Sequence, residues 1–236
     1  MRYFSILLIA CFFLSCSSSD DSSSYVPTPV NLEIPPLFNT LLLPPLIPID
    51  NPQTLEGIAL GRKLFYEPLL SNDGTLACAN CHLAENSFTD PNRYSTGITG
   101  EMGTRNAMPI VNLAWNFQNN FLWDGSASSL ENQVNDPIEN PIEMNNTWPN
   151  VVATLQATSD YLDLFEQAFG TSTITKELVT KSTYEQLTQN FTDSSSIILQ
   201  KLEELNYQVF FKLLRSSDFG VPQARERVYI VGFRND

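Results

Sequence analysis

The pattern of apolar and polar positions divides this 236-residue chain into four parts. Residues 3–14 form a short continuous apolar run, and residues 27–52 interleave leucines with eight of the chain's fifteen prolines. Residues 54–181 alternate amphipathic stretches with polar loops, whereas residues 197–236 combine one amphipathic stretch with two β-type runs. The chain is therefore expected to consist of several segments of different structural type rather than one uniform domain.

Within the middle segment, helical periodicity is limited to a few stretches. Four stretches carry it: residues 54–66, 151–156, 162–169 and 175–181. Asn150 is expected to cap the second of them, and Gly170 to end the third. The connections are long and polar, so the middle segment is predicted to be mainly α-helical with long loops.

The N-terminus resembles an export signal. Arg2 precedes the apolar run, which is shorter than the ~20 residues needed to span a bilayer. Phe-Leu-Ser-Cys at its end resembles a lipoprotein cleavage site, so residues 1–15 are predicted to be a signal peptide and Cys16 the lipid-modified first residue. An ordinary signal peptide cut nearby is the alternative. Residues 16–53 then form a Ser/Asp-rich tether and a proline-rich extended arm.

Composition narrows the chemistry. The chain has 26 acidic and 13 basic side chains and a net charge of -13, which argues against nucleic-acid binding by the chain as a whole. It has a single histidine, so a metal site built from several histidines is excluded.

That histidine completes a Cys-x-x-Cys-His motif: Cys78, Cys81 and His82. Two cysteines at this spacing can form thioethers with the two vinyl groups of one haem, and the adjacent histidine can bind its iron. A thioredoxin-like motif would need a βαβ setting, and a structural zinc would need further ligands; a simple disulfide remains an alternative. The motif indicates covalent haem c. Because no second imidazole exists, the sixth iron position is open or is filled by Met, a weaker ligand or water.

Further motifs in the middle segment resemble the N-terminal half of bacterial di-haem cytochrome c peroxidases. They are residues 60–71 (LGRKLFYEPLLS), 88–90 (FTD), 105–109 (RNAMP), 121–125 (FLWDG), 129–133 (SLENQ) and 140–144 (NPIEM). The resemblance spans residues 54–181 and implies a cytochrome c-like haem domain. It also implies reduction of hydrogen peroxide to water with electrons from a small cytochrome c or cupredoxin, and a second, C-terminal haem that takes in those electrons.

The resemblance also assigns roles to four residues. Glu143 matches the acid–base glutamate that moves a proton between the peroxide oxygens, and Gln133 matches a hydrogen-bonding residue beside it. Trp123 matches the electron bridge between the two haems. Asn106 matches a ligand of a calcium ion between the haem domains, which makes calcium a further candidate cofactor. Without the resemblance these would be a loop carboxylate, a surface amide, a core aromatic residue and a turn residue.

One departure from the family pattern concerns access to the iron. Many of these peroxidases carry a histidine a few residues before the RNAMP-like segment, where it blocks the iron until the other haem is reduced. Residues 96–102 contain no histidine here. We therefore expect a haem that is open to peroxide without reductive activation, with Met102 as a lesser candidate ligand.

The C-terminal part resembles a different family. A helix is predicted at residues 197–207, and strands at residues 209–214 and 228–233. Residues 199–205, 218–227 and 228–233 resemble DNA cytosine-5 methyltransferases. Gln223, Arg225 and Arg227 match that family's Gln-x-Arg-x-Arg segment, whose arginines line the pocket around the target base. The glycine-rich cofactor loop and the Pro-Cys nucleophile are missing, so methyl transfer is not expected.

The whole chain is thus interpreted as a haem domain (residues 54–181), a junction (182–196) and an α/β methyltransferase-like fragment of one helix and two strands (197–236). The junction would arise from a genomic rearrangement or from an artefact of sequence assembly, and we favour the artefact. The predicted function is a truncated haem c peroxidase with one haem, exported to the periplasm or anchored by lipid to the outer membrane of a Gram-negative bacterium. Its membrane contact is expected through the lipid alone, and no nucleic acid is expected for the haem domain. A mono-haem electron-transfer module is the alternative.

Overall fold

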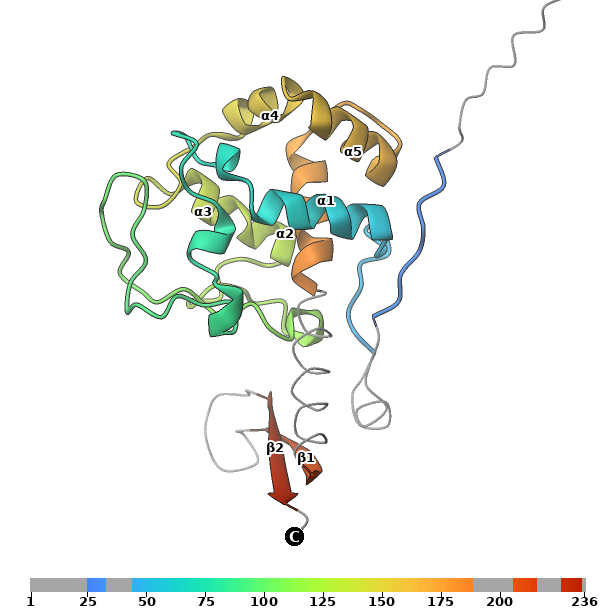
Figure 1. The fold of residues 1–236 in the computed structure, drawn as a ribbon, viewed down its shortest axis with the longest axis vertical. Helices are drawn as coiled ribbons and strands as arrows, with labels where there is room; N and C mark the ends of the chain where they lie inside the picture. Colours follow the sequence, from blue (N-terminus) through green and yellow to red (C-terminus); the bar gives the residue numbers. More distant parts are fainter. Residues whose placement is uncertain (1–24, 33–43, 189–205, 216–225, 235–236) are drawn as a thin grey trace, which may run out of the picture.

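The computed structural model describes residues 25–32, 44–188, 206–215 and 226–234 (Figure 1). Residues 44–188 form short helices joined by long loops, which confirms the predicted mainly α architecture. The α-helices are α1 (Leu55–Phe65), α2 (Leu130–Gln133), α3 (Asn135–Glu139), α4 (Trp148–Gln156), α5 (Ser159–Phe169) and an unlabelled helix at residues 176–188. Four 3-10 turns lie between them: η1 (Pro68–Leu70), η2 (Cys78–Asn80), η3 (Ala84–Asn86) and η4 (Leu113–Trp115). Within these ranges no helix is long and apolar enough to cross a membrane.

Helix α1 begins and ends where its sequence provides capping groups. The hydroxyl oxygen of Thr54 accepts a hydrogen bond from the backbone N–H of Gly57. Glu56 lies in the first turn, and Arg62 and Lys63 lie in the last, so the side-chain charges complement the helix dipole. The predicted helix at residues 54–66 is therefore confirmed, to within one residue at each end.

Helices α4 and α5 show one incorrect and one correct boundary. Asn150 is not a cap, because α4 already begins at Trp148 and Thr147 occupies the cap position. Pro149 falls in the first turn, where the missing N–H costs no helical hydrogen bond. Helix α5 ends at Gly170, as predicted, with a φ of 70° that favours glycine.

The core lies where α1, α5 and the helix at residues 176–188 meet. Leu60, Leu64, Phe165 and Val179 are fully buried there. In Figure 1, α4 and α5 lie above α1, and the orange helix crosses it. This crossing is close because α1 presents glycines. A Cβ added at Gly61 would collide with the main-chain oxygen of Ser182.

The helix at residues 176–188 is continuous across residue 181, where the sequence interpretation ended the haem domain. Its second half contributes Tyr184 and Leu187 to the same core. The Tyr184 hydroxyl also donates a hydrogen bond of 2.7 Å to the main-chain oxygen of Leu46 in the proline-rich arm. Residues 182–188 therefore pack as part of the helical domain.

The described start of the arm runs along the outside of this domain. The backbone N–H of Leu55 donates to the Thr28 carbonyl, and the Val30 N–H donates to the Gln53 carbonyl, both at 2.9 Å. The Tyr25 hydroxyl donates to the main-chain oxygen of Ala168. These bonds join the arm to the ends of α1 and α5.

The C-terminal part contains an antiparallel pair, β1 (Tyr207–Arg215) and β2 (Glu226–Arg234). Its register runs from Tyr207 opposite Arg234 to Arg215 opposite Glu226. The strands predicted at residues 209–214 and 228–233 are thus confirmed. Tyr207, assigned to the end of the predicted helix, belongs to β1, and residues 197–205 lie outside the described residues.

Candidate functional site

The Cys-x-x-Cys-His motif folds into one tight turn. Cys78 begins η2, and its carbonyl accepts hydrogen bonds from the backbone N–H groups of Cys81 and His82, at 3.2 and 3.0 Å. Asn80 supports the turn from the side, because its Oδ1 accepts a bond of 2.8 Å from the N–H of Ala77. This turn keeps the two thiols and the imidazole close together in a short piece of chain.

The His82 ring is held in one tautomer. Its Nδ1 lies 2.9 Å from the main-chain oxygen of Phe88. A carbonyl oxygen can only accept, so Nδ1 carries the hydrogen and Nε2 presents its lone pair. Burial lowers the pKa of His82, although the main chains of Phe88 and Met108 partly oppose this. A neutral imidazole whose outer nitrogen donates to a carbonyl is the usual arrangement of a metal-binding histidine.

The two thiols are not activated as nucleophiles. Cys78 and Cys81 form no disulfide in the described part of the chain, and both are half-buried. Burial raises the pKa of Cys78 to about 12 and also raises that of Cys81. A redox-active Cys-x-x-Cys would need a lowered thiol pKa, so the disulfide-exchange alternative is disfavoured. Among the described residues, no three His, Cys, Asp or Glu side chains are grouped so that they could hold a metal ion. Two unpaired thiols beside a neutral imidazole fit a covalently bound haem.

Glu143 lies in electrostatic range of this turn. Its carboxylate contributes to the raised pKa of both Cys78 and Cys81. One of its oxygens, Oε1, accepts a bond of 2.9 Å from the Asn140 side chain. Burial raises the pKa of Glu143 itself. The structure therefore brings together the predicted acid–base residue and the predicted haem attachment site, and makes that carboxyl easier to protonate.

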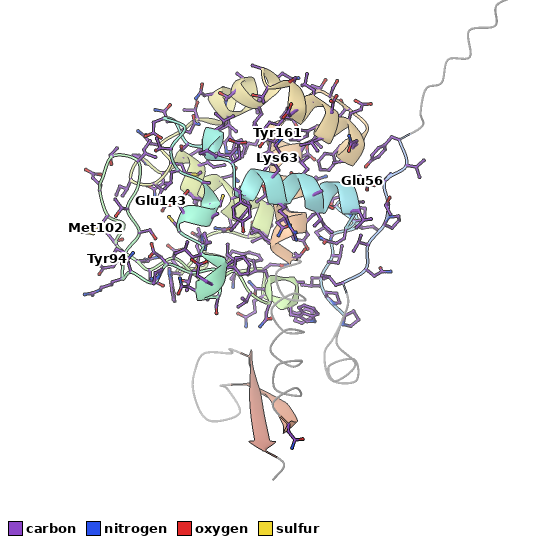
Figure 2. All side chains as sticks on the ribbon, viewed as in Figure 1. Glu56, Lys63, Tyr94, Met102, Glu143 and Tyr161 are labelled. Atoms are coloured by element: carbon purple, nitrogen blue, oxygen red, sulfur yellow. The ribbon has the colours of Figure 1, made fainter. Side chains whose placement is uncertain are left out.

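The loop without a histidine packs against the main chain of Glu143. The Ile98 N–H donates a hydrogen bond of 3.0 Å to the Glu143 carbonyl, and Thr96 and Met102 form an isolated β-bridge that closes the loop. A Cβ added at Gly97 would collide with the main-chain oxygen of Ile142. Met102 points outward and is 64% exposed. In Figure 2 it lies at the outer edge of the loops, with Glu143 nearer the helices.

Trp123 and Asn106 are in contact, although they lie on different loop segments, residues 121–125 and 105–109. Trp123 is 54% exposed, and its ring N–H donates a bond of 2.8 Å to the main-chain oxygen of Asn106. The Asn106 side chain is engaged within the loops: Oδ1 faces the Thr89 hydroxyl, and Nδ2 donates to main-chain oxygens of Asp90 and Asn92. Gln133 is the half-buried last residue of α2.

Sequence reasoning missed one feature of the site and one feature of the fold that supports it. The Phe88 carbonyl that faces His82 is a main-chain group, so only the conformation of residues 87–89 reveals it. Glu185, a buried carboxylate that binds the start of α1, was assigned to the junction. Its neighbours on the same helical face, Lys181, Ser182 and Thr188, are polar, so nothing in the sequence indicated that it would be buried.

The remaining candidates fall elsewhere. Cys16, Gln223 and Arg225 lie outside the described residues. Arg227 belongs to β2, where it is paired with Leu214 of β1.

Two families match parts of the chain. The sequence model of the di-haem cytochrome c peroxidase family matches residues 55–196, which is more than half of the chain. The model of C-5 cytosine-specific DNA methylases matches residues 176–236, so the two matches overlap over residues 176–196.

Individual relatives agree with the first match. The methylamine utilization protein MauG of Methylorubrum extorquens is 42% identical over 52% of this chain and 34% of its own length. The cytochrome c peroxidase Ccp of Escherichia coli is 34% identical over 55% of this chain and 28% of its own. The chain spans about a third of the length of the curated relatives it matches.

A solved structure supports the fold. A MauG-like protein associated with microbial copper homeostasis superposes with a TM-score of 0.63 and 31% identity, over 73% of this chain and 50% of that one. The di-haem peroxidase BthA of Burkholderia thailandensis superposes with a TM-score of 0.53 at 22% identity, over 61% and 40% of the two chains, and supports the fold alone.

Proposed function

The chain belongs to the di-haem cytochrome c peroxidase family, and we propose that its helical domain binds one haem c and reduces hydrogen peroxide to water. Cys78 and Cys81 would hold the haem through thioethers, and His82 Nε2 would bind its iron. The observation that carries this proposal is the bond of 2.9 Å between His82 Nδ1 and the Phe88 carbonyl. It fixes the tautomer that iron binding needs, on a turn that also presents two unpaired thiols.

The bound haem would supply the electrons and the Lewis-acid centre for cleavage of the O–O bond. Glu143 would transfer the proton between the two peroxide oxygens. Its Oε1 is engaged by Asn140, so Oε2 is the oxygen that would take a proton from one peroxide oxygen and return it to the other. Its pKa, which burial raises, supports this role, because a carboxyl that is easier to protonate can give a proton back as an acid after taking it as a base.

Access to the iron is the second part of the proposal. His82 is the only histidine of the sequence and would bind the iron, so this chain has no second imidazole that could block the iron. Met102, the lesser candidate ligand, points outward. We therefore expect peroxide to bind without prior reduction of a second haem.

The remaining roles follow the family pattern. Trp123, which is 54% exposed, would pass electrons toward this haem from the second haem of the family pattern, and a small cytochrome c or cupredoxin would be their source. Gln133 would hydrogen-bond the peroxide beside Glu143. Asn106 stays a candidate calcium ligand. The N-terminal segment would export the chain, with Cys16 carrying the lipid anchor, and the methylase-like part would have no catalytic role.

Expression of the full chain with a cytochrome c maturation system tests the proposal. A covalent haem spectrum with peroxide turnover that falls at least 100-fold in Glu143→Gln would support it. Glu139→Gln, on an exposed carboxylate at the end of α3, is the matched control and should retain turnover. Covalent haem without turnover would instead indicate an electron-transfer module, and a low-spin ferric spectrum of a haem with two protein ligands, such as His82 and Met102, would contradict the open site.

A further inference from the structure

We propose that Thr89 and Asn106 form a clamp that fixes the Phe88 carbonyl against the His82 ring and thereby tunes the iron-binding strength of that imidazole. The inference rests on the proposed haem ligation by His82. It assigns Thr89 and Asn106 a positioning role, since both act on the iron ligand through the main chain of Phe88.

The Phe88 carbonyl reaches His82 only because the chain turns sharply before it. Ser87 and Phe88 have φ angles of 59° and 56°, two consecutive left-handed residues with side chains. Such residues rarely adopt this conformation, and they keep it only when the surrounding structure holds them in place. The turn therefore needs an external support.

Thr89 provides that support on one side. Its backbone forms an isolated β-bridge with Leu83, and its hydroxyl lies 3.1 Å from Asn106 Oδ1 and next to the main-chain oxygen of Ala107. The one hydroxyl hydrogen is shared between these two acceptors. The residue directly after the aimed carbonyl is thus joined to a second loop.

Asn106 completes the connection in the opposite direction. Its Nδ2 donates to the main-chain oxygens of Asp90 and Asn92, at 3.1 and 2.7 Å. Both ends of one amide therefore hold residues 89–92. The Ile110 N–H adds a bond of 3.3 Å to the Phe88 carbonyl itself. The loops at residues 87–92 and 106–110 are thus hydrogen-bonded to each other around the Phe88 oxygen that faces His82.

The second loop also acts on His82 directly, because the main chain of Met108 opposes the effect of burial on the ring's pKa. The clamp thus joins the two segments whose main chains interact with the His82 ring. A firm hydrogen bond at Nδ1 makes Nε2 a stronger donor and favours ferric over ferrous iron. Loosening the clamp should weaken the iron–histidine bond and raise the haem reduction potential.

The test uses the full chain matured with haem and three variants at the clamp. Thr89→Val removes the hydroxyl but keeps the branched shape, Thr89→Ser keeps the hydroxyl, and Asn106→Ala removes the amide. Thr158→Val is the matched control, because its hydroxyl donates to a main-chain oxygen, that of Thr154, at the start of α5. The readouts are the midpoint potential and the iron–histidine stretching frequency of the ferrous protein.

We expect Thr89→Val and Asn106→Ala to raise the potential and lower the stretching frequency, while Thr89→Ser and the control stay close to the parent chain. Unchanged values in both clamp variants would overturn the inference while leaving the proposed function intact. If Thr89→Val fails to retain haem, Asn106→Ala decides in the same way, provided that it and the parent chain are compared in a calcium chelator, because Asn106 is also the candidate calcium ligand. A parent chain without covalent haem would instead refute the proposed function on which the inference rests.

Discussion

Thr54 donates two hydrogen bonds to the same oxygen of the buried Glu185 carboxylate, from its backbone N–H at 2.8 Å and from its hydroxyl at 3.1 Å. The same hydroxyl oxygen accepts the capping bond from the Gly57 N–H. Glu185 is only 1% exposed, and it approaches α1 so closely that a Cβ at Gly57 would collide with its carboxylate. One buried acid thus joins the start of α1 to the helix at residues 176–188.

This pair predicts a pH-dependent stability. Burial raises the pKa of Glu185 to about 7, with a further contribution from Glu56 and against the bonds from Thr54. Because the folded-state pKa lies above the unfolded one, this stability is fully present below about pH 4.5 and is lost as the pH rises through 7. The total loss should be ~3 kcal/mol.

Glu185→Gln removes the titration and nearly preserves the shape. Its free energy of unfolding should therefore fall less than that of the parent chain between pH 5 and pH 8, as measured by urea unfolding at both values. Glu166→Gln, on an exposed carboxylate of α5, should keep the parent's pH dependence. Parallel pH profiles for the parent and Glu185→Gln would contradict the prediction.

Gly97 predicts an effect on catalysis at a distance from the haem motif. A methyl group here would displace the main chain of Ile142 and with it the adjoining Glu143. We expect Gly97→Ala to lower peroxide turnover by 10-fold or more, because small displacements of a proton-transfer group are costly. Covalent haem content should stay unchanged.

Gly103→Ala in the same loop is the control, since its added Cβ would meet nothing closer than 3.8 Å. Steady-state turnover of both variants, normalised to haem, gives the comparison. Equal activities would show that the loop does not position Glu143.

Gly61 predicts an effect on stability. The Cβ introduced by Gly61→Ala would meet the Ser182 main-chain oxygen, and main chain cannot move aside as a flexible side chain can. The gain in helix propensity is below ~1 kcal/mol, whereas overpacking typically costs ~1–3 kcal/mol. We expect a net loss of about 2 kcal/mol in chemical unfolding. Ser182→Gly would not rescue it, because the clash is with backbone, and rescue would contradict the packing described.

The parts of the fold that were predictable have local causes. Gly170 marks the end of α5 through its left-handed conformation, a signal that acts within one turn. The start of α4 at Trp148 was missed because Pro149 reads as a helix breaker, although a proline in the first turn is tolerated. The continuation of the last helix beyond Lys181 depends on Tyr184 and Leu187 packing against distant segments.

The site divides in the same way. The spacing of Cys78, Cys81 and His82 was visible because covalent attachment depends on side chains at fixed intervals. The role of the Phe88 carbonyl could not be predicted from the sequence. Every residue has a carbonyl, and only the backbone conformation directs this one at His82. Glu185 belongs to the fold rather than to the site, and it could be identified only once the structure placed it opposite Gly57 of α1.

The C-terminal boundary of the helical domain can be tested by truncation. The family match to residues 55–196 and the packing of residues 182–188 both place the end of the helical domain after residue 181. A chain ending at 181 would lose Tyr184, Leu187 and the Glu185 bonds to Thr54, and would expose the apolar surface they cover. Losing two large buried side chains costs several kcal/mol, comparable to the ~5–15 kcal/mol stability of a whole domain. We therefore expect the chain 1–181 to aggregate or remain unfolded, and the chain 1–196 to unfold cooperatively with retained haem. Circular dichroism melting of the two chains tests this. A stable, haem-loaded chain 1–181 would show that the domain ends at residue 181 and that residues 182–188 do not contribute to its stability.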